Sequence, residues 1–186
     1  MRILIMGPPG VGKGTQAKHI KTELKILHLS TGEILRKEIY QKTEIGNEAK
    51  IYIDKGCLVP DEILLNIMKD RLFRPECSQG YILDGFPRTI TQASGLDNIM
   101  DSLDETLDVV ISLIADKDEL IKRLINRGEE SGRSDDAEAI IRNRQQIYWR
   151  ETAPLLDYYQ TKGLLKNVDG LGSVLEITNR ILNVLK

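Results

Sequence analysis

The sequence predicts an α/β protein with a five-stranded parallel sheet between two layers of helices, a three-layer α/β/α arrangement. Short apolar runs alternate along the chain with segments of helical periodicity, which is typical of parallel strands joined by helices. One run, Val109–Leu113, is apolar at nearly every position, as expected for a strand buried on both faces. The five expected strands are Ile3–Met6, Leu27–Leu29, Tyr81–Leu83, Leu107–Ala115 and Leu164–Val168.

The length and composition are those of a single folded domain, residues 1–186. Hydrophobic residues make up 41% of the chain and charged residues 29%, which excludes a disordered protein, and no apolar run is long enough to span a membrane. The net charge of −2 argues against a protein that coats nucleic acid or an anionic membrane. Because the chain opens with a strand, leaving no room for a signal peptide, and shows no repeat or zipper, we expect a cytoplasmic monomer.

The segment Gly7–Thr15 follows the first expected strand directly and reads Gly-Pro-Pro-Gly-Val-Gly-Lys-Gly-Thr. Its glycines allow successive backbone N–H groups to point into one concavity, and a helix that begins near Lys13 adds the positive end of its dipole. We predict a phosphate-binding loop, in which Lys13 reaches the β- and γ-phosphates of a nucleotide and Thr15 lies close to the accompanying magnesium. Gly14 departs from the general motif, in which serine or threonine follows the lysine. The alternative, a turn without a ligand, is disfavoured by the flanking strand and helix.

The gap between the second and third expected strands, from Ser30 to Gly80, is longer than a simple crossover needs. It contains three helical patterns, which are Thr31–Lys42, Ile45–Lys55 and a third that follows Pro60 and is capped by Asp61. We therefore expect a helical insertion beside the sheet, which forms a second ligand pocket and can move relative to the first.

Two charged residues follow the third expected strand. Asp84 ends that strand, and Arg88 comes shortly after it, in a rigid turn with Gly85 and Pro87. A carboxylate at the end of a strand next to a phosphate-binding loop can hold magnesium or its water ligands, and we favour this role over a simple turn cap. Arg88 can be aimed at a phosphate from such a turn, although a lone exposed arginine is more often just solvated.

Four further arginines gather in the second half of the sequence. Arg123 and Arg127 are spaced i, i+4 on an expected helix, Arg133 follows after a glycine-containing loop, and Arg144 lies in a long helical stretch, Ala137–Gln160. Acidic residues that can pair with them are Glu129, Glu130, Asp135 and Asp136. An exposed charged face is therefore one interpretation. The phosphate-binding loop favours the other, in which the arginines offset the charge of bound phosphates.

The histidines and the larger aromatic residues are not expected at the site. His19 and His28 have no acid or nucleophile near them in the sequence, so we expect structural roles for both. Trp149, Tyr158 and Tyr159 are interpreted as packing residues, because aromatic residues make up only 5% of the chain and form no cluster on which bases could stack.

Further motifs complete a pattern that runs along the whole chain. Besides Gly7–Thr15 they are Ser30–Arg36, Gly56–Asp61, Gly80–Thr89, Gln92, Arg127–Asp136, Arg144 and Gly170–Val174. With them the sequence resembles the nucleoside monophosphate kinases, and most closely the adenylate kinases that have a short lid. The resemblance implies a phosphotransferase that moves the γ-phosphate of ATP reversibly to AMP, giving two ADP, with Mg²⁺ bound alongside ATP. It also implies an NMP-binding insertion at 30–59 and a short lid at 127–133.

The resemblance further assigns roles to individual residues. ATP would lie on Gly10, Val11, Gly12, Lys13, Gly14 and Thr15, with Arg123 against the adenine, Arg127 near the phosphates and Gly172 at the edge of the base. AMP would contact Thr31, Arg36, Cys57, Leu58, Val59, Gly85, Phe86, Pro87, Arg88 and Gln92. Arg133 and Arg144 would bridge the two sets of phosphates and would contact AMP as well. The catalytic set implied is Lys13, Asp84, Arg88, Arg123, Arg127, Arg133 and Arg144, and Thr15 and Asp84 would hold magnesium through water.

Two details narrow this expectation. Some long-lid relatives carry a four-cysteine zinc site where this chain has only a short loop, and with Cys57 and Cys77 alone we expect no structural zinc. Thr31 and Gln92 favour AMP, because relatives that phosphorylate UMP or CMP tend to lack this threonine and to carry asparagine in place of the glutamine. A uridylate/cytidylate kinase and a catalytically silent nucleotide-binding regulator are the alternatives. The sequence leaves open whether the Cys57 thiol reaches the AMP pocket.

Overall fold

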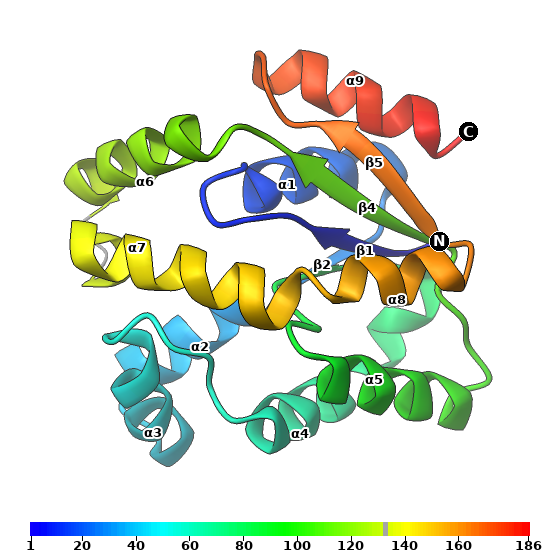
Figure 1. The fold of residues 1–186 in the computed structure, drawn as a ribbon. Helices are drawn as coiled ribbons and strands as arrows, with labels where there is room; N and C mark the ends of the chain where they lie inside the picture. Colours follow the sequence, from blue (N-terminus) through cyan, green and yellow to red (C-terminus); the bar gives the residue numbers. More distant parts are fainter. Residues whose placement is uncertain (132–133) are drawn as a thin grey trace.

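The computed structural model describes residues 1–131 and 134–186, so Arg133 of the implied catalytic set lies outside the described residues. Its strands form one sheet in the order β2-β3-β1-β4-β5, in which every neighbouring pair is parallel (Figure 1). The strands are β1 (Arg2–Met6), β2 (Leu27–Ser30), β3 (Tyr81–Asp84), β4 (Val109–Ile114) and β5 (Leu165–Asp169). The predicted parallel sheet is confirmed, and the carboxyl ends of all its strands share one edge, where α/β proteins bind their ligands.

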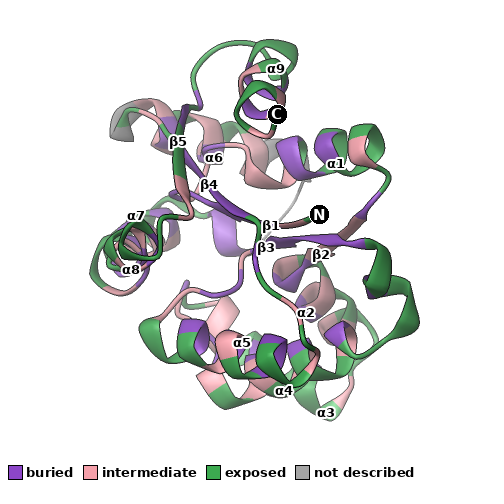
Figure 2. Ribbon diagram, turned by 90° about the vertical axis from the view of Figure 1, so that its right-hand side faces the viewer, coloured by how far each residue is buried: buried purple, intermediate pink, exposed green. Residues whose placement is uncertain are grey.

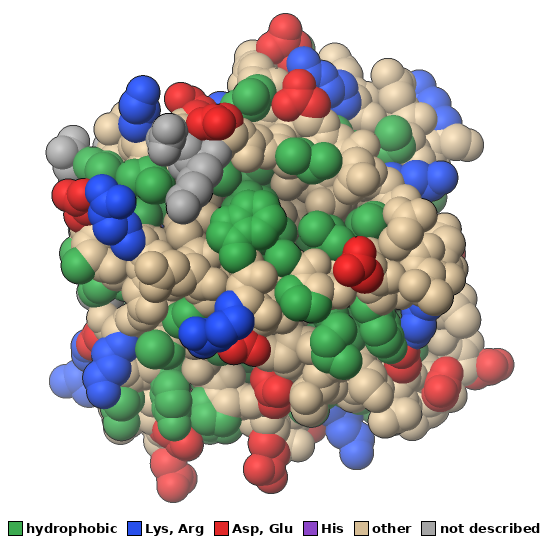
Figure 3. Space-filling model, viewed as in Figure 1, with side chains coloured by type: hydrophobic (Ala, Val, Ile, Leu, Met, Phe, Trp, Pro, Cys, Tyr) green, Lys and Arg blue, Asp and Glu red, His purple; other side chains and the backbone are tan. Residues whose placement is uncertain are grey.

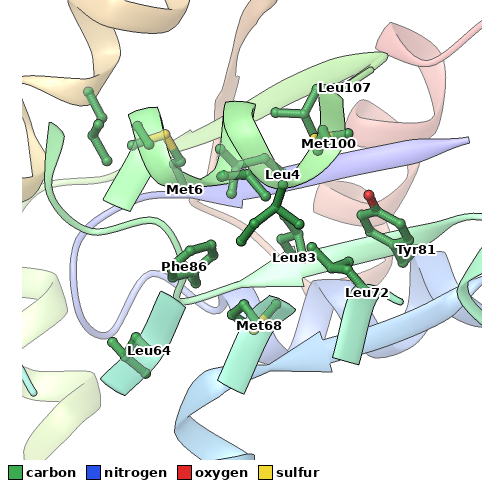
Figure 4. Packing of buried hydrophobic residues seen from close by; sticks show 14 of the residues in the cluster. Leu4, Met6, Leu64, Met68, Leu72, Tyr81, Leu83, Phe86, Met100 and Leu107 are labelled. Carbon is green, nitrogen blue, oxygen red and sulfur yellow. The ribbon is translucent and has the colours of Figure 1, made fainter. Parts of the chain in front are cut away.

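Helices cover both faces of this sheet, as Figure 2 shows from the side. They include α1 (Lys13–Leu24) and α9 (Val174–Val184) on one face and α4 (Asp61–Leu72), α5 (Ile90–Ser102) and α8 (Leu155–Thr161) on the other. Alternate residues of the central strand point to opposite faces. Ile3 and Ile5 therefore pack in the core beneath α1 and α9, whereas Leu4 and Met6 pack in the core shown in Figure 4. The predicted three-layer arrangement is confirmed.

The helical insertion expected between β2 and β3 is present. Its helices are α2 (Thr31–Tyr40), α3 (Glu44–Ile53) and α4, and a 3₁₀ turn, Pro75–Gln79, leads to β3. Ser30 caps α2, because its hydroxyl accepts a backbone N–H from the first turn. The expected cap of α4 is wrong. Pro60 occupies the capping position, and the carboxylate of Asp61 binds Thr89 and Gln92 at the start of α5 instead of its own helix.

The segment after β4 differs from the prediction in several places. It comprises α6 (Lys117–Ser131), a 3₁₀ turn (Ser134–Asp136), α7 (Glu138–Ile147), a π-helical turn (Tyr148–Thr152) and α8. Helix α6 continues beyond Arg127 into the expected loop. The expected helix over Ala137–Gln160 is divided by the π-helical turn and by Pro154, which has no backbone N–H. Tyr159 is fully buried as expected. Trp149 is 53% exposed, and its ring packs edge-to-face against that of Tyr148, with 5.2 Å between the centroids.

The surface is mixed in charge on the face that Figure 3 shows, where positive and negative side chains lie interspersed. Within the part of the chain that the structure describes, no helix is both long and apolar enough to cross a bilayer. Several positively charged side chains are gathered instead around two pockets, which the phosphate-binding loop borders.

Candidate active site

The loop between β1 and α1 wraps around the side chain of Lys13. The Nζ atom donates hydrogen bonds to the carbonyl oxygens of Gly7 at 2.6 Å and Pro8 at 3.2 Å. Gly10 has φ of +90°, and a Cβ atom there would lie 2.7 Å from the carbonyl oxygen of Leu120, so no other residue fits. The strand–loop–helix arrangement predicted from the sequence is present, and the free N–H groups at the start of α1 form a site for an anion.

Positive charge accumulates around this lysine. Burial lowers the pKa of Lys13 to about 7; the charge of Asp84 opposes the shift, whereas Arg88, Arg144 and Arg127 add to it. Burial likewise lowers the pKa of Arg88, and the charge of Arg144 lowers it further. An anion placed among these groups relieves their mutual repulsion, so the centre of the site favours negatively charged ligands.

Asp84 ends β3 beside the loop and is held by a residue for which the sequence predicted only a structural role. The Nε2 atom of His28 on β2 lies 3.2 Å from Asp84 Oδ2, and both side chains are buried. Burial opposes the ionisation of Asp84, but the hydrogen bond with His28 and the charge of Lys13 outweigh it and lower the pKa of Asp84. A Cβ atom built on Gly14 would lie 3.4 Å from Asp84 Oδ2, so the ionised carboxylate adjoins the loop next to Thr15.

This arrangement fits a magnesium ion bound through water, because Mg²⁺ prefers oxygen ligands and usually keeps several of its waters. Asp84 would supply the carboxylate and Thr15 the hydroxyl. Among the residues that the structure describes, no three His, Cys, Asp or Glu side chains gather as a cluster of ligands for a metal held by the protein alone.

Two pockets open beside the loop. The insertion-side pocket is bordered by the helical insertion, and its predicted residues are Thr31, Arg36, Cys57, Leu58, Val59, Gly85, Pro87, Arg88 and Arg144. The loop-side pocket follows the loop toward α9, and its predicted residues are Gly10, Val11, Gly12, Lys13, Gly14, Thr15, Asp84, Arg123, Arg127 and Gly172. Lys13, Arg36, Arg88 and Arg144 line both pockets, which therefore meet at a cationic wall.

Arg88 is fixed within this wall on three sides. Its Nε atom donates to the carbonyl oxygen of Gly85 at 2.8 Å, its backbone N–H donates to Gln92 Oε1 at 2.7 Å, and its carbonyl accepts from Thr152 Oγ1 at 2.9 Å. Two residues predicted to contact a ligand lie behind the wall instead. Phe86 is fully buried in the core, and Gln92 is fully buried with hydrogen bonds at both ends of its amide. The structure does not bring these two side chains to the surface of the pocket.

A buried carboxylate holds two arginines of the implied catalytic set. Arg127 donates two hydrogen bonds of 2.7 Å to Asp136, and Arg144 donates one of 2.7 Å to Asp136 and pairs with Asp135 at 2.9 Å. Burial opposes the ionisation of Asp136, but its bonds with Arg127 and the charge of Arg144 outweigh this effect and lower its pKa. From the sequence, Asp135 and Asp136 were interpreted only as ion-pair partners of the arginines on an exposed charged face. In the structure the same arginines pair with them and line the pockets.

Two more contacts complete the site. Arg123 pairs with Glu119 at 3.0 Å and donates to the carbonyl oxygen of Gly170 at 3.3 Å, at the wall of the loop-side pocket. Gln145, which the sequence analysis did not single out, donates from Nε2 to the carbonyl oxygen of Pro9 at 3.0 Å. This bond joins α7 to the phosphate-binding loop across most of the sequence, so no local pattern could have indicated it.

Comparison with known proteins gives one consistent result. The family model described as "Adenylate kinase" matches residues 5–164. A protein named adenylate kinase from Leptospira biflexa is 49% identical over 181 residues, with 97% of each chain covered. Proteins of the same name from Kocuria rhizophila and Stenotrophomonas maltophilia are 46% and 44% identical; all of this chain is covered in both cases, with 98% and 100% of the relatives. The chain therefore belongs to the adenylate kinase family.

Proposed function

We propose that the chain transfers the γ-phosphate of ATP reversibly to AMP, giving two ADP, with ATP in the loop-side pocket and AMP in the insertion-side pocket. Membership of the adenylate kinase family supports this reaction. The structural observation that carries the assignment is the shared wall, where Lys13, Arg36, Arg88 and Arg144 line both pockets. Two nucleotides whose phosphates meet there bring more negative charge than a lysine and a metal ion neutralise, and the arginines match this need. A switch that only hydrolyses a nucleotide has no use for the second pocket.

On the donor side, the phosphates of ATP lie against Gly10–Thr15 with Arg127 near them, while Arg123 and the backbone of Gly172 border the adenine. The position of these groups along the loop-side pocket supports the assignment. Magnesium, held through water by Thr15 and Asp84, would neutralise charge on the β- and γ-phosphates when bound. The ionised state of Asp84 supports its part in this site.

On the acceptor side, Arg36 and Arg88 grip the phosphate of AMP, and Thr31 and the backbone of Cys57–Val59 border its base and ribose. These residues line the insertion-side pocket, and the hydroxyl of Thr31 donates to the carbonyl oxygen of Gly85 at 2.8 Å, which fixes part of the wall. For Gln92 to read the base directly, its buried amide has to turn its second N–H or its remaining lone pair toward AMP while it keeps its present hydrogen bonds.

The reaction needs alignment and charge compensation rather than an acid or a base. An oxygen of the AMP phosphate attacks the γ-phosphorus, a new P–O bond forms, and the bond from the γ-phosphorus to the β–γ bridging oxygen breaks. The attacking oxygen is already ionised at neutral pH, so no proton has to be removed. Lys13, Arg88 and Arg144 lie where the two pockets meet, and they would stabilise the charge that spreads over the transferring group.

Water has to be excluded during this step, because it would otherwise accept the phosphoryl group in place of AMP. In our proposal the insertion, residues 30–59, and the lid, residues 127–133, close over the bound nucleotides. Arg127, the first residue of this lid, lines the loop-side pocket. We assign Arg133, outside the described residues, to the same group on the family pattern alone.

The experiment that tests this function measures ADP formation from ATP with AMP, CMP, UMP and GMP as acceptors. We expect AMP to be the preferred acceptor. Preferred phosphorylation of UMP or CMP would assign the chain to the uridylate/cytidylate kinases. Release of inorganic phosphate from ATP without phosphorylation of any acceptor would support a hydrolysing switch, and no reaction at all would support a silent regulator.

A proton should be taken up when ATP binds above neutral pH. At pH 8 the free Lys13, with its pKa of about 7, is mostly neutral, and bound phosphates favour its charged form. ATP is fully ionised at pH 8, since phosphate groups have second pKa values of about 6, so the proton has to come from solvent to the protein. Calorimetric titrations in buffers of different ionisation enthalpy should show uptake at pH 8 and much less at pH 6.

Lys162, which pairs with Asp97 and lines neither pocket, provides the control for this titration. A Lys162→Met protein should take up the same number of protons as the parent. The lowered pKa of Lys13 also makes the free energy of unfolding depend on pH. Between about pH 7 and 10.5 the unfolded chain holds the Lys13 proton and the folded chain does not, so this group makes the free energy of unfolding rise with pH there. Absence of proton uptake at pH 8 would contradict a neutral lysine.

Three remaining expectations stay predictions. We infer that the chain works in the cytoplasm as a monomer and needs no structural zinc. With only Cys57 and Cys77 in the sequence, the four-cysteine site of some relatives cannot form. Sedimentation of the purified protein and metal analysis check the last two.

A further inference from the structure

The carboxylate of Asp61 begins a short chain of hydrogen bonds that ends at Arg88. Asp61 is the first residue of α4, just after the segment 30–59. Its Oδ1 atom accepts from Gln92 Nε2 at 2.7 Å, and its Oδ2 atom accepts from Thr89 Oγ1 at 3.0 Å. The other end of the Gln92 amide, Oε1, accepts the backbone N–H of Arg88 at 2.7 Å. Asp61 is therefore two hydrogen bonds away from an arginine that lines both pockets.

The direction of each bond in this chain is fixed by the chemistry of its ends. An ionised carboxylate only accepts hydrogen bonds, and a backbone N–H only donates. The amide of Gln92 has one accepting and one donating end, so it satisfies Asp61 and Arg88 together in one orientation only. Gln92 is fully buried, which means that water cannot replace a bond that is lost there. Thr89 adds to the constraint, because its hydroxyl donates to Asp61 and accepts the N–H of Gln92 at 3.1 Å.

We propose that Asp61 is a positioning residue of the acceptor site, which acts through Gln92 to hold the backbone of Arg88 in place. The inference rests on the proposed function, in which Arg88 grips the phosphate of AMP. Thr152 and Gly85 hold the carbonyl and the Nε atom of Arg88, so the bond from Gln92 completes the fixation of this residue. Asp61 also ties the start of α4 to the start of α5, next to the Arg88 turn.

The replacement Asp61→Leu tests this role with little change in the size of the side chain. Leucine accepts no hydrogen bond, so both the bond from Gln92 and the bond from Thr89 are lost. We expect kcat/KM for AMP to fall about tenfold, with KM for ATP changed less than about twofold. Glu62→Gln is the matched control, because Glu62 is the other acidic residue in the first turn of α4 and forms no part of the network. Glu62→Gln should leave kcat/KM for AMP and KM for ATP unchanged. This result would show that losing a negative charge near the N-terminus of α4 does not by itself cause the effect at Asp61.

A second measurement follows the network directly in the nucleotide-free protein. The N–H of Arg88, bonded to a buried amide, should exchange slowly with solvent, and Asp61→Leu should speed its exchange about tenfold. The double replacement Asp61→Asn with Gln92→Glu reverses the middle bond. The oxygens of the introduced glutamate then accept from the N–H of Arg88 and from the side-chain amide of the introduced asparagine, whose own oxygen accepts from Thr89. We expect this variant to restore slow exchange at Arg88 even if contacts of Gln92 with AMP are lost.

The outcomes separate the inference from the proposed function. If the parent forms no ADP from ATP and AMP, the proposed function fails while the exchange measurement still tests the network. If the parent is active and Asp61→Leu changes neither Arg88 exchange nor the kinetics with AMP, the positioning role is wrong. Equal losses for AMP and ATP, together with a lower unfolding midpoint that the double variant does not restore, would show that Asp61 only stabilises the fold.

Discussion

Replacement of Lys13 by methionine is expected to lower kcat about 10²–10³-fold while the protein remains folded. Methionine keeps the length of the side chain but removes its charge from the wall at which the two pockets meet. In the proposed reaction this charge faces the phosphoryl group while it is transferred. Its loss therefore reduces stabilisation of the transition state more than it reduces the binding of either nucleotide. The effect should therefore appear in kcat at saturating ATP and AMP, with smaller changes in the two KM values.

Folding should tolerate this change, because burial already disfavours the charged form of Lys13. We expect the midpoint of thermal unfolding, followed by circular dichroism, to stay at or above that of the parent. Lys162→Met is again the control, since Lys162 pairs with Asp97 and lines neither pocket, and kcat should change by less than about twofold. A folded Lys13→Met protein with the kcat of the parent would remove Lys13 from the chemistry.

The fold was predictable to the extent that local patterns determine it. The central strands are mostly apolar runs, such as Val109–Leu113, and the helices of the insertion carry clear periodicity between turn residues. The division of the stretch Ala137–Gln160 was not predictable in the same way. A π-helical turn follows from packing as much as from sequence, and here it belongs to a segment in which Thr152 bonds to the carbonyl of Arg88. The exposure of Trp149 likewise depends on which neighbours the fold supplies.

The residues of the candidate site also differ in whether local sequence patterns could predict them. Lys13 and Arg88 could be named from the sequence because each sits in a short motif whose geometry is local. Their supporting partners could not, because those contacts join residues far apart in the chain. His28 meets Asp84 only through the pairing of β2 with β3, and this register is not readable from either segment alone. Gln92 is a further example, because the motif predicted that its side chain contacts AMP, whereas in the structure this side chain is buried and hydrogen-bonded to the protein.

The second large effect is expected for Asp136→Ala. The side chain of Asp136 is fully buried and accepts three hydrogen bonds of 2.7 Å, two from Arg127 and one from Arg144. Removal of this carboxylate leaves the guanidinium groups of Arg127 and Arg144 close together without the negative charge that they share. Both arginines still line the loop-side pocket. We expect the free energy of unfolding to fall by about 3 kcal/mol and kcat/KM to fall about 10²-fold, because both arginines lose their orientation.

Chemical denaturation and steady-state kinetics measure the two effects separately. Glu138→Ala is the matched control, since Glu138 pairs with Arg142 and both side chains are 62% exposed, and its loss should cost less than about 1 kcal/mol with no change in activity. Asp136→Ala with unchanged stability and kinetics would mean that Arg127 and Arg144 are held by other groups.

The sign of the pH dependence gives a further check on Asp136. Its pKa in the folded protein lies below the ordinary value of 3.8, so its contribution to stability is complete above that pH and is lost as the pH falls through the lowered value. The difference in the free energy of unfolding between the parent and Asp136→Asn should therefore be constant near neutral pH and should shrink only in strong acid. A difference that already narrows between pH 7 and pH 5 would show that the carboxylate is not held in its ionised form by the two arginines.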